Sequence, residues 1–162
     1  MTRKNNKQPP QKPKCPFQCA IENTPEISSA YRKGLQALKN NETGKVIACK
    51  PTLLDGSVDI DSAVVDLYPE DNRWDYAIGY NGKVCYVEIH PAYTSEVKRI
   101  EDKLSWLKKW LKEKAPQLQL LPMASSPFVW VQTNGNYILP QSFQAKRLSK
   151  LGIVLVPVHK LL

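Results

Sequence analysis

The stretch RWDYAIGYNGKVCYVEIHPA, residues 73–92, predicts two antiparallel strands joined by a tight turn. Apolar residues run along both sides of Asn81-Gly82, and an Asn-Gly pair favours a type I′ turn because both central residues need a positive φ. We therefore predict strands at about residues 74–80 and 83–90. With Asn81 and Gly82 as the whole loop, Tyr80 pairs with Lys83, and this pairing fixes the register of the hairpin.

Three polar residues, Asp75, Glu88 and His90, interrupt these otherwise apolar strands. The register places Asp75 directly opposite Glu88, with His90 two residues further along the same face. Opposite side chains have Cβ atoms about 4.5–5.5 Å apart, and like charges at that distance are destabilising. A shared proton, a nearby cation such as Arg73, or a divalent metal ion would compensate. The alternative is a wet, frayed hairpin end from which Glu88 reaches solvent.

The remaining sequence predicts helices and strands that surround this hairpin. A first helix, capped by Thr24, runs from Pro25 to about Asn40 on an apolar stripe of Ile27, Tyr31, Leu35 and Leu38. Strands are predicted at residues 45–49, 127–133 and 153–158, and helices at residues 95–114 and 142–151. A hairpin followed by strand–helix–strand units predicts a mixed sheet with helices on its faces, the α/β class.

At the hairpin, the chain resembles the PD-(D/E)xK, or restriction-endonuclease-like, superfamily of nucleases. The resemblance rests on Asp75 in the first strand, on Glu88-Ile89-His90 in the second, and on the order of the elements. It covers about residues 24–158. It implies a restriction-endonuclease-like mixed β-sheet flanked by helices. His90 stands where the superfamily pattern has lysine, and Trp74 stands where it has proline.

The resemblance implies a hydrolase that cleaves phosphodiester bonds in nucleic acid with a divalent metal ion, Mg²⁺ or Mn²⁺. Asp75 and Glu88 are then metal ligands, and His90 either binds the metal or positions the attacking water. Superfamily members commonly add a carboxylate from the first helix, for which Glu26 is the best match and Glu22 the alternative. Glu26 has a second interpretation, because an acid at a helix N-terminus complements the helix dipole.

The net charge of +8 comes from the two ends of the chain. Residues 1–20 and residues 114–162 contain five basic residues each and no acidic residue. This excess favours a polyanionic partner such as nucleic acid, with Lys146, Arg147 and Lys150 on the late helix as candidate phosphate contacts. It also fits a solubilising tail and ordinary surface lysines. We predict a disordered basic tail at residues 1–20 and a single α/β nuclease-like domain at residues 21–162.

The sequence also bears on membrane and protein partners. The chain contains no apolar run of the roughly 20 residues that span a membrane and no apolar core of a secretory signal, so we expect a soluble, cytoplasmic protein.

Trp106 and Trp110 lie four residues apart on the long helix. They fit either a homodimer or partner surface, or a helix packed across the sheet. A superfamily member that lost catalysis and binds nucleic acid or a protein is the alternative function.

Overall fold

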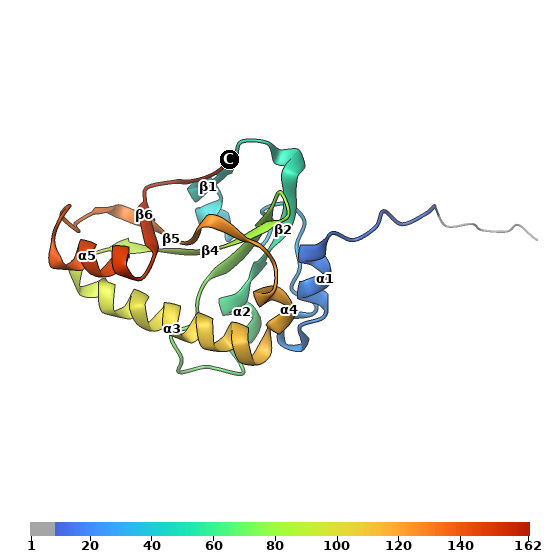
Figure 1. Ribbon diagram of the computed structural model, residues 1–162, viewed down its shortest axis with the longest axis horizontal. Helices are drawn as coiled ribbons and strands as arrows, with labels where there is room; N and C mark the ends of the chain where they lie inside the picture. Colours follow the sequence, from blue (N-terminus) through green and yellow to red (C-terminus); the bar gives the residue numbers. More distant parts are fainter. Residues whose placement is uncertain (1–8) are drawn as a thin grey trace, which may run out of the picture.

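A five-stranded mixed sheet forms the centre of the computed structural model, which describes residues 9–162 (Figure 1). The strand order is β2-β3-β4-β5-β6. The first three strands are antiparallel neighbours, whereas β4, β5 and β6 run parallel. Their bounds are Leu54–Asp59 for β2, Tyr76–Tyr80 for β3, Lys83–Ala92 for β4, Met123–Asn136 for β5 and Ile153–Val156 for β6. The prediction of a mixed α/β sheet with flanking helices is confirmed.

The hairpin of β3 and β4 has the register that its turn predicts. Tyr80 pairs with Lys83, and Tyr76 pairs with Val87, one step before the position where Asp75 meets Glu88. Asn81 and Gly82 have φ angles of 50° and 73°, as a type I′ turn requires. The short loop and the fixed register together place Asp75 and Glu88 side by side at the start of β3.

Helices cover one face of the sheet, with α3 (Val97–Lys114) lying along it (Figure 1). Ile100, Leu104 and Leu107 of α3 pack against Tyr86 and Trp130 of the sheet in the larger apolar core. The other helices are α1 (Pro16–Glu22), α2 (Ile60–Val64), α4 (Pro116–Gln119) and α5 (Phe143–Lys150). Serine 142 caps α5, because its hydroxyl accepts a hydrogen bond from the amide of Ala145 at 3.1 Å.

A small parallel pair of strands covers the opposite face. β1 (Val46–Ala48) pairs with β7 (His159–Leu161), so the end of the described chain returns beside its first strand. Val46 and Leu161 pack with Ile78 and Val87 in a second, separate core. Both faces of the hairpin are therefore buried, although only one of them is apolar throughout. In the described part of the chain, no helix is both long and apolar enough to cross a membrane.

The predicted first helix, residues 25–40, is wrong. Only Pro25–Ile27 form a short 3-10 helix, and the chain then passes through turns, with Gly34 at a φ of 54°. The apolar stripe was misleading because its members serve different cores: Ile27 lies in the larger core and Leu38 in the second one. Between them, the amide and carbonyl of Arg32 pair with Ser57 of β2, which replaces helical hydrogen bonds.

The predicted tail also extends too far. Residues 16–20 belong to α1, whose Phe17, Ala20 and Ile21 are buried in the larger core. Pro16 at the first helical position and the Cys15 thiol, which accepts from the amide of Gln18, start this helix. Residues 1–8 of the predicted tail lie outside the described residues. Among residues 9–162, the first helix begins with Pro16.

Gly79→Ala is expected to destabilise the fold by about 1–3 kcal/mol, because the added methyl group overfills a packed site. A Cβ at Gly79 would lie 2.5 Å from Cγ of the Phe17 ring, in the contact of α1 with the sheet. Gly44→Ala is the matched control, since its Cβ would meet no atom within 4 Å. Urea unfolding of both variants measures the difference, and equal stabilities would contradict the packing described here.

Candidate active site

Asp75 and Glu88 are held side by side by hydrogen bonds from backbone amides of the hairpin. The amide of Asp75 donates to Oε2 of Glu88 at 3.1 Å, and the amide of Ile89 donates to Oδ2 of Asp75 at 3.0 Å. The Glu88 side chain is fully buried and that of Asp75 is 16% exposed. A wet hairpin end is therefore excluded for Glu88. One oxygen of each carboxylate is fixed by an amide, which leaves Oδ1 and Oε1 for another partner.

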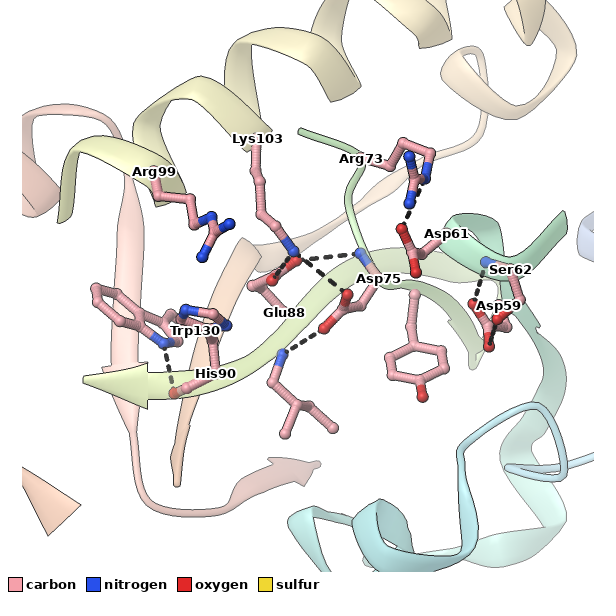
Figure 2. A network of polar contacts seen from close by, with 12 residues as sticks. Asp59, Asp61, Ser62, Arg73, Asp75, Glu88, His90, Arg99, Lys103 and Trp130 are labelled. Atoms are coloured by element: carbon pink, nitrogen blue, oxygen red, sulfur yellow. Dashed lines mark hydrogen bonds and ion pairs between the residues drawn. The ribbon is translucent and has the colours of Figure 1, made fainter. Parts of the chain in front are cut away.

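That partner is Lys103, which reaches down from α3 between the two acids (Figure 2). Its Nζ contacts Oε1 of Glu88 directly and lies 3.5 Å from Oδ1 of Asp75. Arg73, the cation that the sequence suggested, instead donates to Asp61 and to the carbonyl of Tyr68. The compensating charge thus comes from a helix that follows the hairpin in sequence.

Sequence reasoning missed Lys103, although a signal was present. Lys103 lies three residues after Ile100 and four before Leu107, two buried members of the stripe on α3. A lysine at such a position points toward the sheet and needs a buried anionic partner. Asp75 and Glu88 are the acids that the hairpin register places opposite each other, so the same alternation that located them also offers a partner for Lys103.

Burial shifts the protonation of this cluster. It raises the pKa of Glu88 well above its ordinary value, and the charge of Asp75 adds to the rise while Lys103 opposes it. The pKa of Asp75 is raised by burial as well, again against the effect of Lys103. For Lys103, burial alone would lower the pKa, but the charges of Glu88 and Asp75 outweigh it and the pKa is raised. Burial and the neighbouring charges together therefore raise the pKa of all three groups.

The raised pKa of Glu88 predicts a specific dependence of stability on pH. Above the ordinary value of 4.5 and up to the raised value, the folded protein holds a proton that the unfolded chain has released. The free energy of unfolding of the wild type, relative to that of Glu88→Gln, therefore falls as the pH rises through this window. Urea unfolding at a series of pH values measures it, and a flat or rising difference would contradict the burial of an ionisable Glu88.

His90 lies near the acid pair but is engaged elsewhere. Its Nε2 lies 2.7 Å from Oε2 of Glu96, in the short 3-10 helix Thr94–Glu96 that precedes α3. Its carbonyl accepts a hydrogen bond from Nε1 of Trp130 at 3.0 Å (Figure 2). Hydrogen bonding to His90 lowers the pKa of Glu96, so this pair favours a charged carboxylate. The structure brings His90 to the border of the site and not into contact with the carboxylates.

Glu26, the acid expected from the first helix, belongs to a different cluster. Its carboxylate accepts hydrogen bonds from Nε1 of Trp110 at 2.7 Å and from the hydroxyl of Tyr68 at 2.8 Å. Trp110 is buried and stacks on Trp106, with ring centroids 5.8 Å apart. Glu26 therefore has a structural role, because its carboxylate holds Trp110 and Tyr68 together. The two indoles pack within the protein itself. Glu22, the alternative acid, pairs with Lys14 at the surface.

The basic residues of α5 differ in whether they form an ion pair. Arg147 is paired with Glu101 of α3, and its guanidinium lies 5.5 Å from the ring centroid of Phe143. Lys146 and Lys150 are at least partly exposed on the same helix. Lys146 and Lys150 thus remain candidate phosphate contacts, whereas Arg147 already has an anionic partner.

A cavity of about 280 Å³ is lined by Lys103 of this cluster, while neither Asp75 nor Glu88 lines it. His90, Arg99 and Lys103 line one part of it, and Arg73 with Asp61 and Asp71 line another. Arg99 also lies on α3, and its side chain is 55% exposed. An anionic group in this cavity would lie beside the exposed guanidinium of Arg99 and the more buried ammonium of Lys103.

The donor set fits a hard divalent cation in part. Two carboxylate oxygens converge on one point from neighbouring strands, and oxygen ligands of this kind suit Mg²⁺ or Mn²⁺. A cation there must displace or share the position of the Lys103 ammonium. Within residues 9–162, no group of three or more His, Cys, Asp or Glu side chains gathers at one point. The set Asp75, Glu88 and His90 is thus reduced to its two acids.

Comparison of the chain with protein-family models, with curated proteins and with solved structures gave no match. The function must therefore be argued from the geometry of this site.

Proposed function

We propose that the protein is a metal-dependent nuclease whose active centre consists of Asp75, Glu88 and Lys103. One observation carries the proposal. Oδ1 of Asp75, Oε1 of Glu88 and Nζ of Lys103 converge at one point, and the Glu88 side chain there is fully shielded from solvent. An acid, a second acid and a lysine are the three groups of the PD-(D/E)xK pattern. Here the lysine reaches the acids from α3, which accounts for the histidine at position 90.

Each residue has a role that its contacts support. Asp75 and Glu88 would hold the divalent ion, which, when bound, lowers the pKa of a water and offsets charge on the phosphate. The backbone amides of Asp75 and Ile89 fix the two carboxylates in orientation. Lys103, within reach of both acids, is placed to hold the attacking water or a phosphate oxygen beside them. Arg99, which lines the same cavity as Lys103, is placed to bind a neighbouring phosphate.

The arrangement of elements supports the restriction-endonuclease-like fold as part of this proposal. The acids lie on an antiparallel hairpin, the next helix covers them, and β5 and β6 extend the sheet in parallel. The structure differs from the superfamily pattern before β1, where α1 and a series of turns replace the long first helix. Because Glu26 is anchored by Trp110 and Tyr68, the proposed centre needs no acid from that region.

The proposal is tested by incubating single-stranded and duplex DNA and RNA with the protein in Mg²⁺, in Mn²⁺ and in EDTA. We expect cleavage that requires the metal ion and that is lost in Asp75→Asn. Asp66→Asn is the matched control, because the same change is made at an exposed site of α2's C-terminal flank. Cleavage that persists equally in Asp75→Asn would exclude this centre.

A catalytically inactive nucleic-acid-binding protein is the second candidate, favoured by one observation. The ammonium of Lys103 already occupies the position between the carboxylates, as a purely structural ion pair would. In that case nucleic acid binds with a strong dependence on salt, without any requirement for a divalent ion. The same incubations, followed by binding measurements, separate the two candidates.

A further inference from the structure

Tyr93 and Tyr137 form an exposed aromatic pair beyond the carboxyl ends of β4 and β5. Their ring centroids lie 5.1 Å apart with an interplanar angle of 29°, and 39% and 57% of their surfaces are exposed. The amide of Tyr137 donates to the carbonyl of Ala92, which fixes the second tyrosine at the end of β4. The pair is therefore held in place by the sheet while its rings face solvent.

The segment that carries Tyr137 is anchored on both sides of the ring. Ile138 is buried in the larger core, and its amide donates to Oδ1 of Asn136 at 2.8 Å. Tyr137 projects outward between these two anchors. An aromatic ring held outward on a fixed backbone loses little conformational entropy when it binds a flat ligand.

The aromatic pair is connected to the proposed active centre through a short path. The amide of Glu96 donates to the carbonyl of Tyr93, and the Glu96 carboxylate contacts His90 and lies 3.7 Å from Arg99. His90 and Arg99 line the cavity that leads to Lys103. Tyr93 follows His90 by three residues, which corresponds to about 10 Å of extended chain. The backbone of Tyr93 is therefore close to that of His90, which lines the cavity.

The charge of this part of the chain suits a polyanion. Arg99, which lines the cavity, is exposed, and residues 114–162, which include the Tyr137 segment and α5, contain five basic residues and no acidic one. Exposed aromatic rings beside basic side chains bind unpaired bases by stacking and their phosphates by charge. A duplex offers its phosphates, but its base faces are already stacked on one another.

We propose that Tyr93 and Tyr137 form a base-stacking platform that selects single-stranded nucleic acid for the neighbouring site. This inference rests on the proposed nuclease function, since it names the substrate class of that site. The strand's bases stack on the tyrosines, and its backbone passes Arg99 to bring a phosphate toward Lys103.

The binding test uses the wild-type protein in EDTA with a fluorescently labelled oligothymidylate and with a labelled duplex of the same length. Tyr93→Ala and Tyr137→Ala are each expected to weaken single-strand binding by about tenfold to a hundredfold and to leave duplex binding unchanged. Tyr137→Phe is expected to keep the wild-type affinity. Leu120→Ala, a truncation of an exposed apolar side chain beyond the other end of α3, is the control. Single-strand affinity that is unchanged in both tyrosine-to-alanine variants would overturn the platform.

A parallel cleavage assay keeps the two proposals distinct. If the wild type cleaves single strands and both alanine variants do so at the same rate, the platform is overturned and the nuclease stands. If the alanine variants lose single-strand binding but the wild type cleaves no nucleic acid, the platform stands and the nuclease is overturned. If the wild type does not bind the oligothymidylate at all, the platform is overturned. Circular dichroism checks that each variant is folded.

Discussion

Glu88→Gln is expected to lower the rate of nucleic-acid cleavage by about 10³-fold while the protein remains folded. The substitution keeps the shape of the side chain but removes the charge that would hold the metal ion. A bound divalent ion supplies several kcal/mol of transition-state stabilisation, and each 1.4 kcal/mol corresponds to about a factor of ten in rate. Initial rates on one labelled substrate at a fixed Mn²⁺ concentration measure the loss.

The control for this prediction is Glu70→Gln, the same chemical change at an exposed position. It should cleave at the wild-type rate. Near-ultraviolet circular dichroism of both variants reports on the packing around the sheet. A folded Glu88→Gln protein that cleaves as fast as Glu70→Gln would remove Glu88 from the active centre.

Lys103→Met is expected to destabilise the protein by about 3–5 kcal/mol at neutral pH, the usual cost of removing one partner from a buried ionic cluster. Its loss leaves Asp75 and Glu88 facing each other without a cation, one of them fully buried. Acid should reduce the deficit, because protonation of the carboxyl groups relieves their repulsion. Urea unfolding at neutral and acidic pH measures both effects, with Lys112→Met on the exposed side of α3 as the control.

A double substitution tests whether the deficit comes from the acid pair. Adding Glu88→Gln to Lys103→Met replaces a buried carboxyl group, which must either ionise beside Asp75 or take up a proton, by a neutral amide, so the double variant should be more stable than Lys103→Met alone. Residues in one ionic network show coupling energies of about 0.5–3 kcal/mol, which unfolding measurements resolve. Additive effects of the two substitutions would mean that Lys103 stabilises the fold by some other contact.

The hairpin could be predicted from sequence because its signals are local. Asn81-Gly82 specifies the turn, the turn specifies the register, and the register places Asp75 beside Glu88. The long helix and the two buried strands carry equally local signals, namely periodicity and apolar runs. The complete burial of Glu88 could not be predicted from the sequence, because it depends on how α3 lies over the sheet.

The predictions of the first helix and of Glu26 were wrong because the residues involved pack against segments that are distant in sequence. The stripe of Ile27, Tyr31, Leu35 and Leu38 has helical spacing, but its residues pack into cores on opposite sides of the sheet. Glu26 fitted a family pattern, yet Trp110, which is 84 residues away in sequence, anchors its carboxylate. The role of Lys103 likewise depends on a tertiary contact, although its place within a buried stripe is visible in the sequence.

The most direct measurement is a calorimetric titration of Mn²⁺ into the wild type, Glu88→Gln, Glu70→Gln and Lys103→Met. We predict saturable binding by the wild type and Glu70→Gln, and none by Glu88→Gln. Lys103→Met should bind more tightly than the wild type, because the ion no longer competes with an ammonium group for the same two oxygens. Absence of binding by the wild type, or binding that Glu88→Gln leaves unchanged, would contradict a metal-dependent centre at Asp75 and Glu88.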